Sequence, residues 1–327
     1  MNVVRLIGFS VLAILALVVL TIAAVWYLNP FAPPVVVSDP GPRGRRITDN
    51  GLIANYYPAS GAGKHAGILL LGGSEGGIGP GVARMAAALQ EQDYAVLNLS
   101  FFRAPGQSGK LELVPLELFD RAIAWLKAQP EIDGERLAVV GGSKGAEAAL
   151  IVATRHPELR AVVAGMPSSV AWQGIDWNFL NYILNPPNGS WSLGGKPIPF
   201  VPYVKKFTKS LLQLYSESLA LRLEHKSAII PIELSRASVL LICGKDDSLW
   251  PSCTMADQIK ARADEGGPAV TVLAYSNAGH GVFGVPLEKS NANYPALGSL
   301  GGTADGNNSA RIDGWPKTLQ HLNTALK

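Results

Sequence analysis

The sequence predicts an α/β protein in which a mostly parallel sheet is flanked by helices. Short, continuous apolar runs are typical of strands that are buried on both faces. These runs alternate with helical patterns along most of the chain, which is the rhythm of a parallel sheet with helical crossovers. Of the 327 residues, 48% are hydrophobic and 16% are charged, so the chain can bury a large core.

Each predicted element follows from such a run or pattern. Strands are expected at residues 53–57, 67–71, 95–99, 137–140, 161–164, 239–243 and 270–275. Helices are expected at residues 82–92, 116–128, 144–155, 252–263 and 315–325. Residues 167–236 break the alternation and predict a cap-like insertion between two strands, with one amphipathic helix around residues 211–223.

An uncharged, almost wholly apolar run, residues 6–28, lies near the start of the chain. As a helix it would rise about 35 Å, enough to cross the hydrocarbon core of a bilayer. The run ends in Trp26 and Tyr27, whose side chains suit a membrane interface. We therefore expect residues 1–28 to form an uncleaved transmembrane anchor, with a cleaved signal peptide as the alternative.

Residues 29–46 are rich in Pro, Gly and Arg and predict a semi-rigid linker, which is followed by a globular domain over residues 47–327. Charge leaves the membrane orientation open. The short tail that carries Arg5 favours a domain outside the cytoplasm, whereas Arg43, Arg45 and Arg46 favour the opposite. Our prediction leans towards the outside, that is, the periplasmic face of a bacterial inner membrane.

Composition excludes several classes of function. The formal net charge is +3, and the basic residues form no stripe with interleaved aromatics, so no nucleic-acid partner is expected. The two cysteines form no CxxC or Cys/His cluster, and we predict no metal and no cofactor. Cys243 ends a predicted buried strand, so we expect a free structural thiol there, with a Cys243–Cys253 disulfide as the alternative.

The segment GGSKG, residues 141–145, fits G-x-S-x-G between a predicted strand and a predicted helix. This context is that of a nucleophile elbow, in which the serine occupies a sharp strand-to-helix turn. Gly141 and Gly145 would provide the room that the turn needs. The spacing G-x-x-x-x-G-K-[ST] of a phosphate-binding loop is not met. Ser143 is therefore the candidate nucleophile.

An acid and a base follow later predicted strands. Asp246 and Asp247 come after residues 239–243, and the pattern G-x-x-D-x-x-hydrophobic-Pro favours Asp247. His280 follows residues 270–275 on a glycine-flanked loop. The order Ser143, Asp247, His280 is that of an α/β-hydrolase fold. In this triad His280 would act as general base, and Asp247 would fix its tautomer.

The loop GGSEGG, residues 72–77, follows the first central strand and is the candidate oxyanion hole. We predict that the backbone N–H groups of Lys144 and Ser74 meet the oxyanion, with Glu75 as the alternative to Ser74. The carboxylate of Glu75 would be unhelpful there unless it is turned away or paired.

With these residues in place, the chain resembles the catalytic domain of the acyl-CoA thioesterase / bile-acid-CoA:amino-acid N-acyltransferase family. The similar segments lie in order within residues 67–323: GGSEGG, LAVVGGSKGAEAAL, MPSSVAWQG, PIELSRASVLLICGKDDSLWPS, NAGHGV and GGTADGNNSARIDGWPKTLQHL. The resemblance implies an acyl-enzyme that is resolved by water or by an amine, with an acyl ester or thioester as substrate. Members that conjugate amino acids carry cysteine at the nucleophile position, so Ser143 favours hydrolysis.

Three interpretations remain at this stage: a membrane-anchored thioesterase or carboxylesterase, an acyltransferase that uses an amine, and a catalytically inactive binding protein. Trp172, Trp177 and Trp191 of the insertion either form an acyl pocket or only cover the sheet. Lys205 and Lys206 could meet an anion or could be ordinary exposed lysines. Residues 291–308 are rich in Gly, Asn and Ser and predict a mobile loop over the same face.

Overall fold

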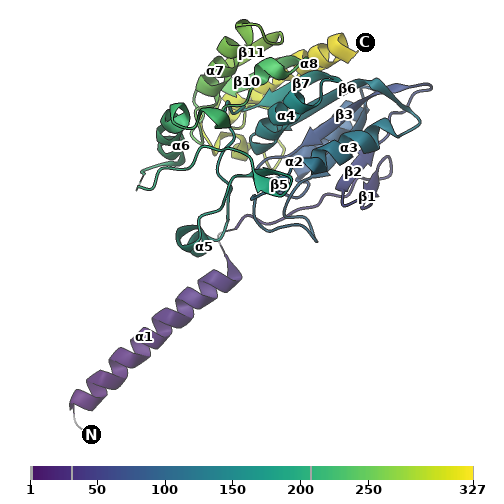
Figure 1. Ribbon diagram of the computed structural model, residues 1–327. Helices are drawn as coiled ribbons and strands as arrows, with labels where there is room; N and C mark the ends of the chain where they lie inside the picture. Colours follow the sequence, from purple (N-terminus) through teal and green to yellow (C-terminus); the bar gives the residue numbers. More distant parts are fainter. Residues whose placement is uncertain (1–2, 31, 207, 327) are drawn as a thin grey trace.

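The computed structural model of the chain describes residues 3–30, 32–206 and 208–326 (Figure 1). Its main sheet has eight strands in the order β1-β2-β4-β3-β6-β7-β10-β11. These strands are β1 (Arg45–Ile47), β2 (Ile53–Tyr57), β3 (His65–Leu71), β4 (Ala95–Ser100), β6 (Ile132–Gly142), β7 (Leu159–Gly165), β10 (Ser238–Gly244) and β11 (Val270–Tyr275). The pairs β4–β3, β3–β6, β6–β7, β7–β10 and β10–β11 are parallel. The pairs β1–β2 and β2–β4 are antiparallel.

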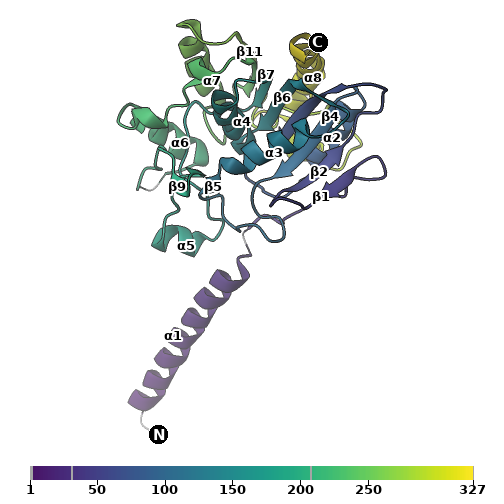
Figure 2. The ribbon, with the colours of Figure 1, turned by 45° about the vertical axis from the view of Figure 1, so that its right-hand side comes forward.

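Helices cover both faces of this sheet (Figure 2). Nearly every residue of its central strands is therefore buried. The five that do so are α2 (Pro80–Gln90), α3 (Glu117–Lys127), α4 (Lys144–Arg155), α7 (Ser252–Asp264) and α8 (Ala304–Leu326). Helices α3, α4 and α7 bury their apolar sides in one core cluster, and α2 and α8 bury theirs in a second. The α/β-hydrolase architecture predicted from the sequence is therefore present.

The insertion between β7 and β10 forms irregular structure with several short elements. They are α5 (Phe179–Leu184), β8 (Trp191–Leu193), β9 (Lys196–Pro197), α6 (Leu211–Ala220), η1 (Leu221–Leu223), η2 (Lys226–Ala228) and η3 (Ile232–Leu234). Strands β8 and β9 join β5 (Val114–Pro115) in a small second sheet. The insertion has its own core, in which Trp172, Tyr203 and Tyr215 pack with Trp250.

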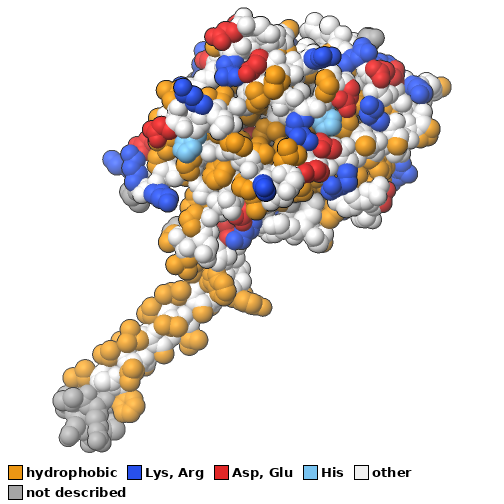
Figure 3. Space-filling view, viewed as in Figure 1, with side chains coloured by type: hydrophobic (Ala, Val, Ile, Leu, Met, Phe, Trp, Pro, Cys, Tyr) orange, Lys and Arg blue, Asp and Glu red, His pale blue; other side chains and the backbone are white. Residues whose placement is uncertain are grey.

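Helix α1 (Val3–Leu28) projects away from the rest of the molecule, and Figure 3 shows hydrophobic side chains along its coloured part. Residues Ile7–Leu28 have a mean hydropathy of 2.7 and are long and apolar enough to cross a membrane. The end of the helix contacts the insertion. Trp26 Nε1 donates to Asn181 Oδ1 at 2.8 Å, and Asn178 Nδ2 donates to the carbonyl of Trp26 at 2.7 Å.

The expectation of a free thiol at Cys243 is wrong, because Cys243 and Cys253 form a disulfide. Cys253 lies in the first turn of α7. The loop between β10 and α7 folds back, so that the Cα atoms of the two cysteines are 5.2 Å apart, inside the range for a disulfide. The burial of the strand favours a free thiol when only the sequence is considered. The sequence does not show that the loop after β10 folds back and brings Cys253 to Cys243.

The expectation of a mobile loop over residues 291–308 is also wrong in part. Pro295–Gly298 forms the short helix η4, and α8 begins at Ala304, well before the predicted start at residue 315. Asn307 is fully buried; its Oδ1 accepts from the N–H of Gly279, and its Nδ2 donates to the carbonyl of Gly301. These tertiary bonds fix the first turn of a helix whose glycines and Pro316 had indicated a later start.

Candidate active site

Ser143 lies between β6 and α4 with φ +55° and ψ −122°, a strained conformation for a residue with a side chain. The turn is sterically possible only because glycines flank it. A Cβ at Gly141 would lie 2.2 Å from the carbonyl oxygen of Gly145, and a Cβ at Gly145 would lie 2.1 Å from the carbonyl oxygen of Gly72. The backbone therefore leaves no room for a side chain at either of the two predicted elbow glycines.

The structure brings Ser143, His280 and Asp247 together at the carboxyl ends of β6, β11 and β10. His280 Nε2 lies 2.9 Å from Ser143 Oγ, and His280 Nδ1 lies 2.9 Å from Asp247 Oδ2. All three side chains are buried, with Ser143 and His280 each 8% exposed. Proton transfer from the hydroxyl to the imidazole requires a separation of this size.

Asp247, not Asp246, contacts the histidine. Asp246 is exposed, whereas Asp247 is buried and fully bonded. Its Oδ1 accepts from the N–H groups of Leu249 and Trp250, and its Oδ2 also accepts from Ser252 Oγ at 2.7 Å. These bonds hold the carboxylate in place beside the imidazole. Sequence reasoning missed Ser252, although it follows Pro251 at the start of the predicted helix.

The candidate oxyanion donors lie on either side of the nucleophile. Within the described part of the chain, the backbone N–H groups of Lys144 and Ser74 have no hydrogen-bond acceptor, whereas that of Ser143 bonds to the carbonyl of Gly165. The Ser74 carbonyl accepts from Trp177 Nε1 at 3.1 Å, which ties the loop to the insertion. Free N–H groups next to a nucleophile are what a developing oxyanion needs.

The carboxylate of Glu75 is turned back onto its own loop, where Oε1 accepts from the N–H of Gly73 at 3.2 Å. The backbone carbonyl of Glu75 accepts from Arg103 Nη1 at 2.9 Å. The side chain is exposed and bonded within the loop, although it still lines the same cavity as Ser143.

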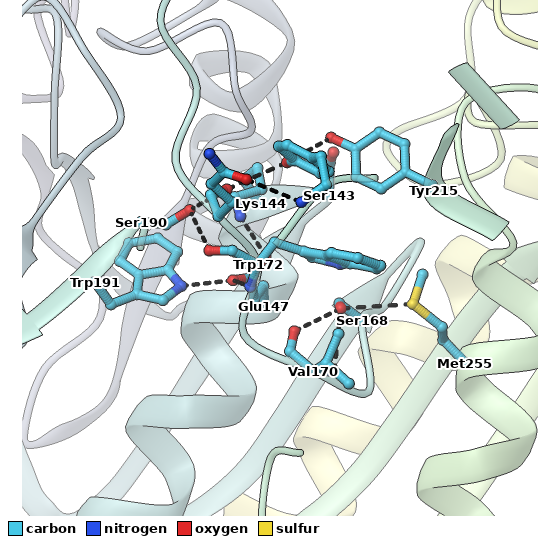
Figure 4. Close-up of polar contacts among 12 residues, drawn as sticks. Ser143, Lys144, Glu147, Ser168, Val170, Trp172, Ser190, Trp191, Tyr215 and Met255 are labelled. Atoms are coloured by element: carbon cyan, nitrogen blue, oxygen red, sulfur yellow. Dashed lines mark hydrogen bonds and ion pairs between the residues drawn. The ribbon is translucent and has the colours of Figure 1, made fainter. Parts of the chain in front are cut away.

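A buried ion pair lies next to Ser143, on α4 (Figure 4). Lys144 Nζ lies 2.6 Å from Glu147 Oε2, and both side chains are at most 1% exposed. Glu147 Oε1 accepts from the backbone N–H of Trp172 and from Trp191 Nε1 at 2.6 Å. Burial lowers the pKa of Lys144, and the charge of Glu147 opposes that shift. The pair bonds α4 to the insertion, and no sequence motif had indicated it.

A cavity of about 560 Å³ opens on the other side of Ser143. Its wall is largely apolar, and it includes Leu70, Met85, Met166, Phe283, Leu287 and Leu297. Helix α2, the loop after His280 and the segment before α8 supply most of these residues. Two arginines, Arg84 and Arg311, also line it.

The insertion contributes little to this cavity, although the sequence allowed a tryptophan-lined pocket. Trp172 and Trp191 are fully buried in aromatic clusters away from it, and only Trp177 of the three lines the wall. Lys206 forms an exposed ion pair with Glu217. Sequence reasoning missed the two arginines of the cavity, which come from different helices far apart in the chain.

The model of the family described as BAAT / Acyl-CoA thioester hydrolase C terminal matches residues 114–327. Acyl-coenzyme A thioesterase 1 of Mus musculus is 26% identical over 242 residues, which cover 74% of this chain and 54% of the mouse protein. Acyl-coenzyme A thioesterase 2, mitochondrial, of Mus musculus is 27% identical over 242 residues, or 74% of this chain and 50% of that protein. The chain thus spans about half the length of these relatives.

Solved structures share the fold at low identity. A dienelactone hydrolase-like promiscuous phosphotriesterase from metagenomic libraries aligns with a TM-score of 0.53 and 15% identity, over 87% of this chain and 98% of that chain. The 2,6-dihydroxy-pseudo-oxynicotine hydrolase aligns with a TM-score of 0.51 and 14% identity, over 86% of this chain and 67% of that chain. These likenesses concern the fold alone.

Proposed function

Because the chain belongs to the BAAT / Acyl-CoA thioester hydrolase C-terminal family, we propose that it is a serine hydrolase of acyl thioesters or carboxylic esters. The relatives support hydrolysis of thioesters in general terms. The observation that carries the specific proposal is the pair of 2.9 Å separations that join Ser143, His280 and Asp247. Each group is within reach of the proton transfer that its role demands.

The proposed reaction proceeds through an acyl-enzyme. Ser143 Oγ attacks the carbonyl carbon while His280 Nε2 takes its proton, and Asp247 stabilises the resulting imidazolium. The N–H groups of Lys144 and Ser74 bind the oxyanion of the tetrahedral intermediate. His280 then gives the proton to the leaving thiol or alcohol. Water next attacks the acyl-enzyme while His280 takes its proton, and His280 returns the proton to Ser143 as the free acid leaves.

Replacement of the nucleophile tests this proposal. We expect Ser143→Ala to abolish labelling by a fluorophosphonate probe and to lower kcat on p-nitrophenyl esters by roughly 10⁴-fold or more. Ser216→Ala, an exposed serine on α6, is the control and should label like the wild type. Equal labelling of Ser143→Ala and the wild type would overturn the assignment.

Product analysis separates hydrolysis from acyl transfer. With an acyl-CoA as donor and glycine or taurine present, a hydrolase gives free acid alone, whereas an acyltransferase gives the amide. We expect free acid, because the nucleophile is a serine. Accumulation of the amide would move the protein to the transferase branch of the family.

We further propose that α1 anchors the protein in a membrane with the catalytic part outside the cytoplasm. The apolar run of α1 supports the anchor, and the Cys243–Cys253 disulfide supports an oxidising compartment. Alkaline phosphatase fused to the C-terminus should be active in the membrane fraction. An inactive fusion would place the domain inside, and activity in the soluble fraction would indicate a cleaved signal peptide.

A further inference from the structure

Two guanidinium groups lie in the cavity beside Ser143 without a carboxylate partner. Arg84 comes from α2 and Arg311 from α8, and both line the same cavity as Ser143 and His280. Within the described chain, no ion pair joins either arginine to an acidic side chain. Both side chains are partly buried, and burial of a guanidinium favours an acidic partner, so their isolation needs a reason.

The bonding of the two side chains shows unused donors. Arg84 Nε is buried and has no hydrogen-bond partner among the described residues. Arg311 Nε donates to the carbonyl of Gly281 at 2.7 Å, and Nη1 donates to that of Val285 at 3.4 Å. These bonds hold the Arg311 guanidinium against the loop that carries His280. Its Nη2 has no acceptor in the part of the chain that the structure describes.

Electrostatics agree with an anion site. Burial lowers the pKa of Arg84. Burial, and then the positive charge of Arg84, lower the pKa of Arg311 to about 10, which leaves Arg311 protonated at neutral pH. Glu75 is the one acidic side chain among the described residues that line the cavity, and its carboxylate is bonded to the loop N–H of Gly73. It compensates neither arginine.

We propose that Arg84 and Arg311 form a subsite for an anionic group of the substrate, a carboxylate or a phosphate. An anion between the two guanidiniums would relieve their mutual repulsion and use their free N–H donors, and the forked guanidinium matches both oxyanion types. The apolar wall would bind the alkyl portion. This inference rests on the proposed hydrolase function, since it assigns part of the substrate of the same site.

The anion has two sources, which matched substrates distinguish. A carboxylate at the far end of the acyl chain is tested by mono-p-nitrophenyl adipate against p-nitrophenyl hexanoate. A phosphate in the leaving group is tested by hexanoyl-CoA against hexanoyl-N-acetylcysteamine. The two members of each pair share the scissile bond and the acyl length. The first pair differs in the terminal carboxylate, and the second differs in the phosphorylated adenosine and pantoate part of CoA.

Arg84→Gln is the decisive variant, because Arg311 also supports the loop of His280. We expect Arg84→Gln to lower kcat/KM for the anionic member of one pair by roughly 10- to 100-fold, mainly through KM. The neutral member should lose much less, and Arg84→Lys should recover part of the loss for the anionic member. Arg160→Gln, an exposed arginine on β7, is the matched control. Equal effects of Arg84→Gln on neutral and anionic members, or none on either, would overturn the subsite.

A binding measurement keeps this result separate from the proposed function. Adipate or inorganic phosphate should raise the Tm of the wild type and not that of Arg84→Gln. A wild type that hydrolyses none of the four substrates but shows this Arg84-dependent shift would refute the hydrolase and retain the anion subsite. The opposite result is activity on the neutral substrates, with no Tm shift and no preference for anionic substrates that depends on Arg84. It would retain the hydrolase and refute the anion subsite.

Discussion

On one side of Ser143, Lys144 and Glu147 pair with each other beneath the insertion. On the other side, Arg84 and Arg311 face a cavity and have no acidic partner among the described residues. The first pair is at most 1% exposed and each Glu147 oxygen is bonded. The second has donors without acceptors among the described residues. Satisfied buried charge fixes local structure, and unsatisfied charge beside a cavity indicates binding. The two flanks should therefore respond differently to mutation.

The largest expected effect is on the packed flank. Glu147→Ala leaves the Lys144 ammonium buried without its partner and removes the acceptor of two tryptophan N–H groups. We expect the free energy of unfolding to fall by about 3–5 kcal/mol, measured by chemical denaturation.

A double variant controls for the charge. Lys144→Met with Glu147→Leu replaces both ions by apolar side chains and should recover much of the loss, while the backbone N–H of residue 144 is kept. If Glu147→Ala unfolds at the same denaturant concentration as the wild type, the pair does not stabilise this flank.

The disulfide also belongs to the packed flank, where Cys243 lies in the same core cluster as Trp191. It closes a loop with a sequence separation of 10 residues. For a loop of this size the chain-entropy model gives about 3 kcal/mol, and we expect Cys243→Ala with Cys253→Ala to lose that much stability. The anion preference of the other flank should not change. Two free thiols in the denatured, unreduced wild type would show that the bond does not form.

The sharp turn at Ser143 could be predicted from sequence because its glycines lie in one short motif. Gly141 and Gly145 stand within two residues of Ser143; a Cβ at Gly141 would clash inside the turn, and a Cβ at Gly145 would clash with the carbonyl oxygen of Gly72. The strands β3, β4, β7 and β10 were equally accessible, since each is a nearly continuous buried run. The positions of Asp247 and His280 followed from the chain order that the fold imposes.

The rest of the site depends on tertiary contacts between residues that are far apart in the sequence, which no short segment reveals. Arg84 and Arg311 lie on different helices, and only the packing of α2 and α8 on one face of the sheet brings them to one cavity. The early start of α8 depends in part on the bond that Asn307 accepts from the N–H of Gly279 in a distant loop. The disulfide depends on how the chain returns after β10.

The smallest expected effect compares one substitution on both flanks. Val152 of α4 is 1% exposed in the packed core, and Val285 lines the cavity. Val152→Phe should overpack its site and lower the free energy of unfolding by about 1–3 kcal/mol. Val285→Phe should leave the Tm nearly unchanged, because its ring has free volume to enter.

The introduced phenyl ring should instead reduce the acyl chain length that the cavity accepts. We expect Val285→Phe to lower kcat/KM for p-nitrophenyl octanoate by roughly 10-fold while the acetate ester is unaffected, because the longer chain competes with the ring for the cavity. Thermal unfolding and a chain-length series measure the two responses separately. If Val285→Phe instead destabilised the protein as much as Val152→Phe, with no change in chain-length preference, the cavity beside the nucleophile would be ordinary core and the contrast between the flanks would not hold.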